Sequence, residues 1–231
     1  MLVVGATGGL GRAAALAAAG AGADVVLLGR KVRALEKLYD EIAAAGANPA
    51  IYPLDLAGAT PNDYAELAAT LERECGRLDG IVHAAAHFDS LQPAEQIAPE
   101  AWLRALHVNL SAPFLLTQAC LPLMRARADA SVVFVIDDPA RTGKAYWGGY
   151  GAAKHALAGL VSILHEEFED TPVRIHGLLP APMRTALRRA AYYGENTLEL
   201  PPPDAAAVVY LLAPAAAAVR GRILDLRAPN G

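Results

Sequence analysis

Tyr150 and Lys154 are the two side chains in this sequence best suited to move a proton. They stand four residues apart in a segment whose apolar spacing predicts a helix, so both lie on one face of it. A nearby ammonium group stabilises a phenolate and draws the pKa of a tyrosine down from about 10 towards neutrality. The pair therefore predicts proton exchange with an alcohol or a carbonyl.

A glycine-rich segment near the start of the chain predicts a phosphate-binding turn. Gly5, Gly9 and Gly11 follow an apolar run and lead into an alanine-rich helix. Glycine permits a tight turn there and lets backbone N–H groups at the helix N-terminus approach a pyrophosphate. A second apolar strand follows the helix, which is the context of a dinucleotide-binding unit. An ordinary turn between strand and helix is the alternative interpretation.

Basic residues stand at the end of the second predicted strand. A site selective for NAD(H) usually has an acidic residue here that binds the ribose 2′-hydroxyl, but Arg30 and Lys31 occupy the position. These cations, with Arg12 on the preceding helix, are suited to a 2′-phosphate. The pattern predicts NADP(H) rather than NAD(H). Asp55, at the end of the third predicted strand, is assigned either to the adenine amino group or to a helix cap.

The segments that must hold these residues alternate between short β-branched runs and longer stretches of helical spacing. This alternation predicts an α/β fold, a doubly wound parallel sheet of Rossmann type with about seven strands and helices on both faces. The predicted strands are 2–4, 25–28, 50–54, 80–83, 131–136, 173–178 and 223–226. No repeat or flexible linker divides the sequence, so residues 1–231 are predicted to form one domain. The irregular segment 184–203 follows a strand end and is predicted to be a substrate lid within it.

Composition and charge argue against several classes of protein. The 231 residues are 54% hydrophobic, enough to bury the core of one α/β domain, and the formal charge of -4 offers no basic surface to nucleic acid. No uncharged apolar run predicts a membrane span and the first residues lack a signal-peptide pattern, so a cytoplasmic protein without a membrane partner is expected. Cys75 and Cys120 lie in no metal-ligand spacing, and no metal site is expected.

The glycine turn and the tyrosine–lysine pair, taken with Asn109, resemble the short-chain dehydrogenase/reductase family over essentially the whole chain. The turn is similar to the family's TGxxxGxG motif with Val4 in place of the threonine, and Asn109 stands where the family keeps a catalytic asparagine. The resemblance implies that Tyr150 is the general acid or base and that Lys154 also binds the nicotinamide ribose. It implies that Asn109 holds a water in a proton relay.

The same resemblance assigns the contacts of the dinucleotide. Residues 180–185 are similar to the family's PGxxxT turn, whose threonine contacts the nicotinamide amide, so Thr185 takes that role. The family's NAG motif after the fourth strand is replaced by alanines, and Ala84 cannot make the hydrogen bonds of the asparagine. The assigned cofactor contacts are Gly5, Gly9, Leu10, Gly11, Arg30, Asp55, Leu56, Ala85, Tyr150, Lys154 and Thr185.

Asp137 stands thirteen residues before Tyr150, where the family keeps its catalytic serine. A serine would donate a hydrogen bond to the substrate oxygen, whereas an ionised carboxylate can only accept and also raises the pKa of a neighbouring tyrosine. Four arrangements are open. Asp137 is held protonated and donates as a serine would, accepts from a hydroxyl or amine on an unusual substrate, abolishes hydride transfer, or turns outward with Asp138 to cap the next segment.

Two functions follow from these residues. The first is an NADP(H)-dependent oxidoreductase that interconverts a carbonyl and an alcohol on a small-molecule substrate. The second is a catalytically impaired protein that binds the nicotinamide cofactor and serves as a sensor or a partner subunit. Trp147, Tyr192 and Tyr193 are the expected walls of a substrate pocket.

The resemblance also implies a homodimer or a homotetramer. The predicted helices 113–127 and 150–168 would pair between subunits, as they do in the family. An apolar stripe on the second helix is expected to need a partner for burial. It consists of Leu157, Leu160, Val161 and Leu164.

Overall fold

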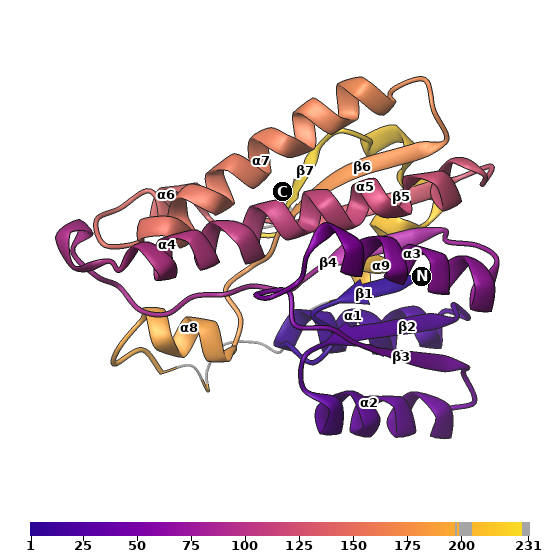
Figure 1. The fold of residues 1–231 in the computed structure, drawn as a ribbon, viewed down its shortest axis with the longest axis horizontal. Helices are drawn as coiled ribbons and strands as arrows, with labels where there is room; N and C mark the ends of the chain where they lie inside the picture. Colours follow the sequence, from indigo (N-terminus) through magenta and orange to yellow (C-terminus); the bar gives the residue numbers. More distant parts are fainter. Residues whose placement is uncertain (197, 199–204, 228–231) are drawn as a thin grey trace.

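Seven strands lie at the centre of the computed structural model, which describes residues 1–196, 198 and 205–227 (Figure 1). They are β1 (Leu2–Val4), β2 (Val25–Gly29), β3 (Pro49–Pro53), β4 (Gly80–His83), β5 (Ala130–Val135), β6 (Val173–Leu179) and β7 (Ile223–Asp225). Each boundary lies within one residue of its predicted position. The prediction succeeds because β1 and β2 are continuous apolar runs and β4 and β6 are rich in branched apolar residues, and all four strands are buried along their whole length.

All seven strands are parallel and follow the order β3-β2-β1-β4-β5-β6-β7. The chain adds strands outward from β1 in one direction, then returns to place β4 on the other side of β1. Open parallel sheets bind ligands at such a reversal, in the crevice beyond the carboxyl ends of the strands. The order therefore directs attention to the loops that follow β1 and β4.

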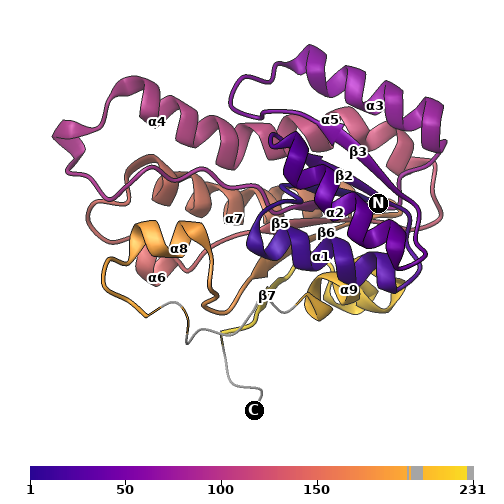
Figure 2. The same cartoon turned by 90° about the horizontal axis from the view of Figure 1, so that it is seen from below.

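The described residues form nine helices around this sheet. They are α1 (Gly9–Gly20), α2 (Val32–Ala44), α3 (Pro61–Cys75), α4 (Pro99–Leu106), α5 (Ala112–Arg125), α6 (Pro139–Thr142), α7 (Gly148–Phe168), α8 (Ala186–Ala191) and α9 (Ala206–Leu212), with short 3-10 turns at Ala94–Gln96 and Pro214–Val219 and a π-helical turn at His107–Ser111. Helices α1, α2 and α9 pack on one face, and α3, α5 and α7 pack on the other (Figure 2). The predicted doubly wound α/β fold is confirmed.

The apolar stripe on α7 is buried inside the chain. Leu157, Val161 and Leu164 are at most 3% exposed, and they belong to the core between the sheet and the helices α3, α5 and α7, with Leu160 packed against it. The expectation that this stripe needs a second subunit is wrong, because the chain's own sheet covers it. Oligomerisation stays a prediction that must rest on other surfaces of these helices.

The predicted lid, 184–203, contains the helix α8. Residues 197 and 199–204 of that segment lie outside the described residues. Within the described part of the chain, no helix is both long enough and apolar enough to cross a membrane.

Candidate active site

A cavity of about 530 Å³ lies at the carboxyl ends of the strands, where the strand order reverses. Its walls come from the loops that follow each strand from β1 to β6. This volume is typical of sites that hold a small molecule or a cofactor. A predicted site residue can act on a ligand bound here only if it lines this cavity.

Two glycines shape the turn that follows β1. Gly5 has a φ of +84°, and a Cβ on it would lie 2.5 Å from the backbone nitrogen of Ala85. A Cβ on Gly11 would lie 2.2 Å from the carbonyl oxygen of Gly5. Neither neighbour is a flexible side chain, so both positions require glycine. The turn thus holds the start of α1 against the loop after β4.

The start of α1 faces the cavity without a capping side chain. The N-cap is Gly8, which has no side chain that could bond the first N–H groups of the helix. Gly8, Gly9 and Leu10 line the cavity. The first N–H groups of a helix have no partner within the helix, and the helix dipole makes this end positive. A pyrophosphate fits such a cradle. The residues present therefore fit the dinucleotide that the glycine spacing predicts.

Arg30 and Lys31 line the cavity directly after β2 and are exposed. Neither takes part in an ion pair among the described residues, so both charges are available to a phosphate. Arg12 does not line the cavity and pairs instead with Glu41 of α2. The predicted contribution of Arg12 to a 2′-phosphate site is wrong for this reason.

Other predicted cofactor contacts also reach the cavity. Asp55, Leu56, Ala85 and Thr185 are among its lining residues. Asp55 accepts a hydrogen bond from the backbone N–H of Ala57 at 3.1 Å, whereas the next helix has its N-cap at Thr60. The helix-cap alternative for Asp55 is therefore wrong. Gly11 lies behind the cavity wall, where its role is to let α1 approach Gly5.

Tyr150 and Lys154 lie at the other end of the cavity, on α7. Both residues are buried, each with an exposed fraction of 4%. The Lys154 ammonium donates a hydrogen bond to the carbonyl oxygen of Val135 at 2.8 Å and lies 5.8 Å from the centre of the Tyr150 ring. The helical spacing therefore brings the pair together in the way the sequence predicts.

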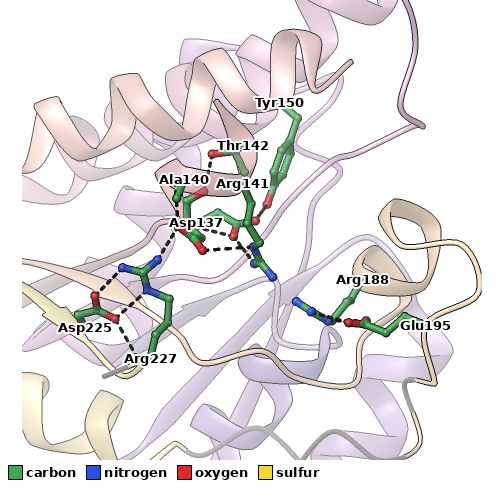
Figure 3. Close-up of polar contacts among 10 residues, drawn as sticks. Asp137, Ala140, Arg141, Thr142, Tyr150, Arg188, Glu195, Asp225 and Arg227 are labelled. Atoms are coloured by element: carbon green, nitrogen blue, oxygen red, sulfur yellow. Dashed lines mark hydrogen bonds and ion pairs between the residues drawn. The ribbon is translucent and has the colours of Figure 1, made fainter. Parts of the chain in front are cut away.

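Asp137 lies directly beside the Tyr150 hydroxyl, which donates a hydrogen bond to its Oδ2 at 2.7 Å (Figure 3). Burial, followed by the charge of Asp137, raises the pKa of Tyr150 well above its ordinary value. Burial lowers the pKa of Lys154 to about 8, although Asp137 opposes that shift. The carboxylate thus works against the effect that a lysine alone would have on the tyrosine.

The second oxygen of Asp137 is held by two other donors. Oδ1 accepts from the backbone N–H of Asp138 at 2.7 Å and from the Arg141 guanidinium at 3.0 Å. Asp138, in contrast, caps α6 through the N–H of Ala140, and it pairs with Arg227 beyond β7. The alternative in which both aspartates turn outward as caps is therefore wrong for Asp137, and for Asp138 only the capping part of it is right, because its side chain is just 13% exposed. The spacing of three and four residues between Arg141 and the two aspartates is typical of ion pairs at a helix start and could have indicated its contacts. The contact of Arg227 with Asp138 follows no spacing in the sequence.

Asn109 is fully buried in the π-helical turn, beside the cavity wall rather than in it. Its side-chain oxygen accepts from the N–H of His87 at 3.0 Å, and its Nδ2 donates to the carbonyl oxygens of His87 and Ala105, each at 2.8 Å. The residue therefore fastens the loop after β4 to the helix. π-Helical turns often occur at functional sites. The predicted water relay stays a prediction.

Aromatic rings surround Tyr150 on the substrate side. Trp147 and Tyr192 line the cavity, and Phe88 packs edge-on against Tyr150 with ring centres 5.4 Å apart. Trp147 lies 5.7 Å from Tyr150 and 6.0 Å from Tyr192. Tyr193 is fully exposed, so its predicted place in the wall is wrong. Phe88 was not indicated by any motif, because it lies in a loop without periodicity.

The described residues contain no group of three or more His, Cys, Asp or Glu side chains arranged to hold a metal ion. His83, at the end of β4, instead bonds through Nε2 to the Thr117 hydroxyl at 2.8 Å.

Known proteins resemble this chain over most of its length. Residues 1–196 match the family described as short chain dehydrogenase. The chain is 35% identical over 212 residues to the uncharacterized oxidoreductase YciK of Escherichia coli K12. The matched residues cover 91% of this chain and 84% of that protein.

Solved structures extend the likeness to the fold. A candidate short chain dehydrogenase from Pseudomonas syringae is 42% identical with a TM-score of 0.92, over 97% of this chain and 92% of that one. A second, from Shigella flexneri and complexed with NADP, is 33% identical with a TM-score of 0.92, over 97% and 95% of the two chains. By this combination of family match, sequence identity and shared fold, the chain belongs to the short chain dehydrogenase family of oxidoreductases.

Proposed function

We propose that the chain is an NADP(H)-dependent oxidoreductase that transfers a hydride between the nicotinamide and a polar double bond of a small molecule, with the carbonyl–alcohol pair as the general case. One observation carries the proposal: Tyr150 and Lys154 line the same cavity as the uncapped start of α1 and Arg30. A proton donor, a cation and a phosphate cradle in one space are what a nicotinamide-dependent reaction requires of the protein.

The cavity offers a partner to each part of the cofactor. We assign the pyrophosphate to the N–H groups at the start of α1 and the 2′-phosphate to Arg30 and Lys31. Thr185 is assigned to the nicotinamide amide and Lys154 to the nicotinamide ribose. The dinucleotide supplies the hydride when it is bound, and these residues orient it. The NADP bound in the Shigella flexneri relative supports this choice of cofactor.

Asp137 is proposed to occupy the position of the family's catalytic serine. Its charge and the burial of the site raise the pKa of Tyr150, so the phenol keeps its proton at neutral pH. A protonated tyrosine can serve as the general acid that reduction needs, but it is a poor base for the oxidation of an alcohol. We therefore assign the reductive direction to this site.

A homodimer or homotetramer is also proposed, on the resemblance to the family. With the α7 stripe buried in the chain, the surface offered to a partner is the outer face of that helix, where Ile163 is 63% exposed.

The experiment that tests the function follows NADPH oxidation against a panel of carbonyl and imine compounds. The wild type should consume NADPH, whereas Tyr150→Phe should still bind NADPH through its other contacts and consume little of it, because the proton donor is removed. Asp137→Ser is assayed beside them. If the wild type and Asp137→Ser both bind NADPH tightly but reduce no compound of the panel, the protein is a cofactor-binding sensor or partner subunit instead.

A further inference from the structure

We propose that Arg188 binds a carboxylate group of the substrate, and that Glu195 occupies this position until the substrate arrives. The compound reduced at this site is then an oxo acid, with its carbonyl at Tyr150 and its carboxylate at Arg188. This inference rests on the proposed function, for which it names the substrate class. The structural feature that carries it is a guanidinium in the cavity wall whose charge is paired with a partly exposed carboxylate from the turn after α8.

Arg188 lies on α8, the helix of the predicted lid, and lines the cavity. Its side chain is 12% exposed, so its charge is largely withdrawn from solvent. A guanidinium stays charged at every pH that a protein meets, and a charge withdrawn from water needs a partner. Whatever binds Arg188 must therefore bring a negative charge.

Glu195 supplies that charge in a geometry that a small molecule can reproduce. Its two carboxylate oxygens accept from Nε and Nη2 of Arg188, each at 2.7 Å (Figure 3). This two-point contact is the arrangement in which a guanidinium and a carboxylate match best. A carboxylate on a ligand can make the same two hydrogen bonds and brings the same single charge.

Glu195 is held less firmly than the arginine that it binds. It stands in the turn after α8, its side chain is 30% exposed, and Arg188 is its one ion-pair partner among the described residues. A carboxylate at the surface is readily solvated when it leaves its partner, and ion pairs of this kind contribute little to stability. A ligand can therefore take the place of Glu195 without breaking the fold.

The surroundings of this ion pair also favour a negative charge. The pKa of Glu195 is lowered, chiefly by its hydrogen bonds with Arg188 and to a lesser degree by the charge of Arg141. Both guanidinium groups lie over the ring of Tyr192, at 4.6 Å and 5.3 Å from its centre. Arg141 has ion pairs of its own, so the departure of Glu195 leaves one cation, Arg188, without a partner. The site thus takes one negative charge.

Two further donors at this place lack an acceptor. The hydroxyl of Tyr192 and Nε of Arg141 are buried, and neither makes a hydrogen bond within the described part of the chain. Both residues line the cavity. A buried donor without an acceptor is costly, and a carboxylate offers acceptors only. A ligand that carries one would satisfy donors that the protein leaves open.

The carboxylate site and the proton donor belong to the same cavity. Trp147 contacts the aromatic rings at both places, with its ring centre 5.7 Å from that of Tyr150 and 6.0 Å from that of Tyr192. An apolar spacer that rests on Trp147 would carry a carbonyl towards Tyr150 and a carboxylate towards Arg188. The expected substrate is therefore an aldehyde or ketone with a carboxylate on the far side of a ring or a short apolar chain.

Binding of two unreactive probes tests the carboxylate site without relying on turnover. Benzoate and benzamide share a ring and differ in charge, and each is titrated by calorimetry into the protein loaded with NADP⁺. Benzoate should bind the wild type about tenfold or more tightly than benzamide. Arg188→Gln should abolish the difference, and Arg188→Lys should keep part of it, because lysine retains the charge but not the two-point contact.

Two more variants complete this binding experiment. Arg189→Gln removes a neighbouring cation that is exposed and does not line the cavity, so it should bind both probes as the wild type does. Glu195→Gln removes the competing carboxylate and should bind benzoate about threefold or more tightly than the wild type. NADPH binding, followed by nicotinamide fluorescence, shows that each variant is folded.

Turnover of a second matched pair tests whether the carboxylate belongs to the substrate. The compounds are para-carboxybenzaldehyde and its methyl ester, which have the same aldehyde and differ in charge. With NADPH, the wild type and Arg189→Gln should reduce the acid with a kcat/KM about tenfold or more above that for the ester, mainly through a lower KM. In Arg188→Gln the two values should be nearly equal.

Equal binding of benzoate and benzamide by the wild type overturns the proposal, and so does a preference for benzoate that survives Arg188→Gln. NADPH affinity that falls about tenfold in Arg188→Gln but not in Arg189→Gln also overturns it, because Arg188 would then bind a phosphate of the cofactor. An unchanged benzoate affinity in Glu195→Gln overturns the role given to Glu195.

The turnover results separate this proposal from the one on which it rests. Reduction of the ester as fast as the acid overturns the oxo acid as substrate class and upholds the function proposed above. Benzoate binding that depends on Arg188, with no reduction of either aldehyde, upholds the carboxylate site and overturns the proposed function.

Discussion

The imidazole of His83 stacks on the ring of Phe134, with ring centres 4.9 Å apart and planes inclined by 7°. The two residues sit on the adjacent strands β4 and β5, and both are buried. Burial, with a smaller contribution from the charge of Lys154, lowers the pKa of His83 to about 3. The histidine is therefore neutral in the folded protein at neutral and mildly acidic pH.

His83 should make the protein sensitive to mild acid. Its pKa is lower in the folded state than the 6.5 of an unfolded chain, so its contribution is complete above pH 6.5 and is lost as the pH falls from 6.5 towards 3. Between pH 7 and pH 5 the free energy of unfolding should fall by about 2 kcal/mol through this residue. Urea unfolding at the two pH values measures the loss.

The matched variants are His83→Gln, which cannot titrate, and His155→Gln on the exposed side of α7. His83→Gln should lower the stability at pH 7 but flatten its dependence on pH, and His155→Gln should leave that dependence unchanged. An equally steep loss in wild type and His83→Gln would contradict the assignment.

Asp137→Ser should raise the rate of reduction of simple ketones by about tenfold or more. This corresponds to an activation free energy lowered by more than roughly 1.4 kcal/mol. The serine restores a donor to the substrate oxygen and removes a charge that raises the pKa of Tyr150. NADPH affinity should change little, since Asp137 lies at the substrate end. Steady-state kinetics with both proteins check this. A serine variant slower than the wild type on ketones would mean that Asp137 itself donates a proton.

Arg30→Ala should narrow the preference for NADPH over NADH by about 1–3 kcal/mol, the scale of a hydrogen bond to a charged group. Titration calorimetry with both nucleotides gives the difference. Arg12→Ala is the control: Arg12 pairs with Glu41 away from the cavity, so its loss should leave the preference within about 0.5 kcal/mol of the wild type. Equal affinities for the two nucleotides in the wild type would refute the role of Arg30.

Gly11→Ala should destabilise the fold by more than about 3 kcal/mol and abolish NADPH binding, because the added carbon meets the backbone of Gly5 at 2.2 Å. Gly20→Ala, at the other end of the same helix, meets no atom within 4 Å and should change stability by less than about 1 kcal/mol. Urea unfolding compares the two. Similar stabilities for both variants would show that the turn can open.

The fold and the cofactor end of the site were predictable because their signals are local. The run 132–135 is apolar, as expected of a strand covered by helices on both faces, and the position of a strand can be seen directly from such a run. Gly5 and Gly11 touch each other within a single turn. The helical spacing of Tyr150 and Lys154 likewise places both at one end of the cavity.

The contacts around the substrate end of the cavity could not be predicted from local patterns in the sequence. Asn109 fastens the loop at His87, and Arg227 reaches Asp138 from beyond the last strand. These pairs depend on the order of strands in the sheet, not on any spacing. The apolar stripe on α7 that includes Val161 shows a related limit of such signals. An apolar stripe indicates that a helix face is buried, but it does not say whether the same chain or a second one buries it.

The position of β1 has a consequence for synthesis. It lies between β2, which follows it closely in the chain, and β4, which begins only at Gly80. As the nascent polypeptide leaves the ribosome, one apolar edge of β1 has no partner until α2, β3 and α3 have all been made. Unpaired edges of this kind recruit other chains. Translation of residues 30–79 is therefore the interval in which this edge of β1 lies without the strand that covers it in the finished sheet.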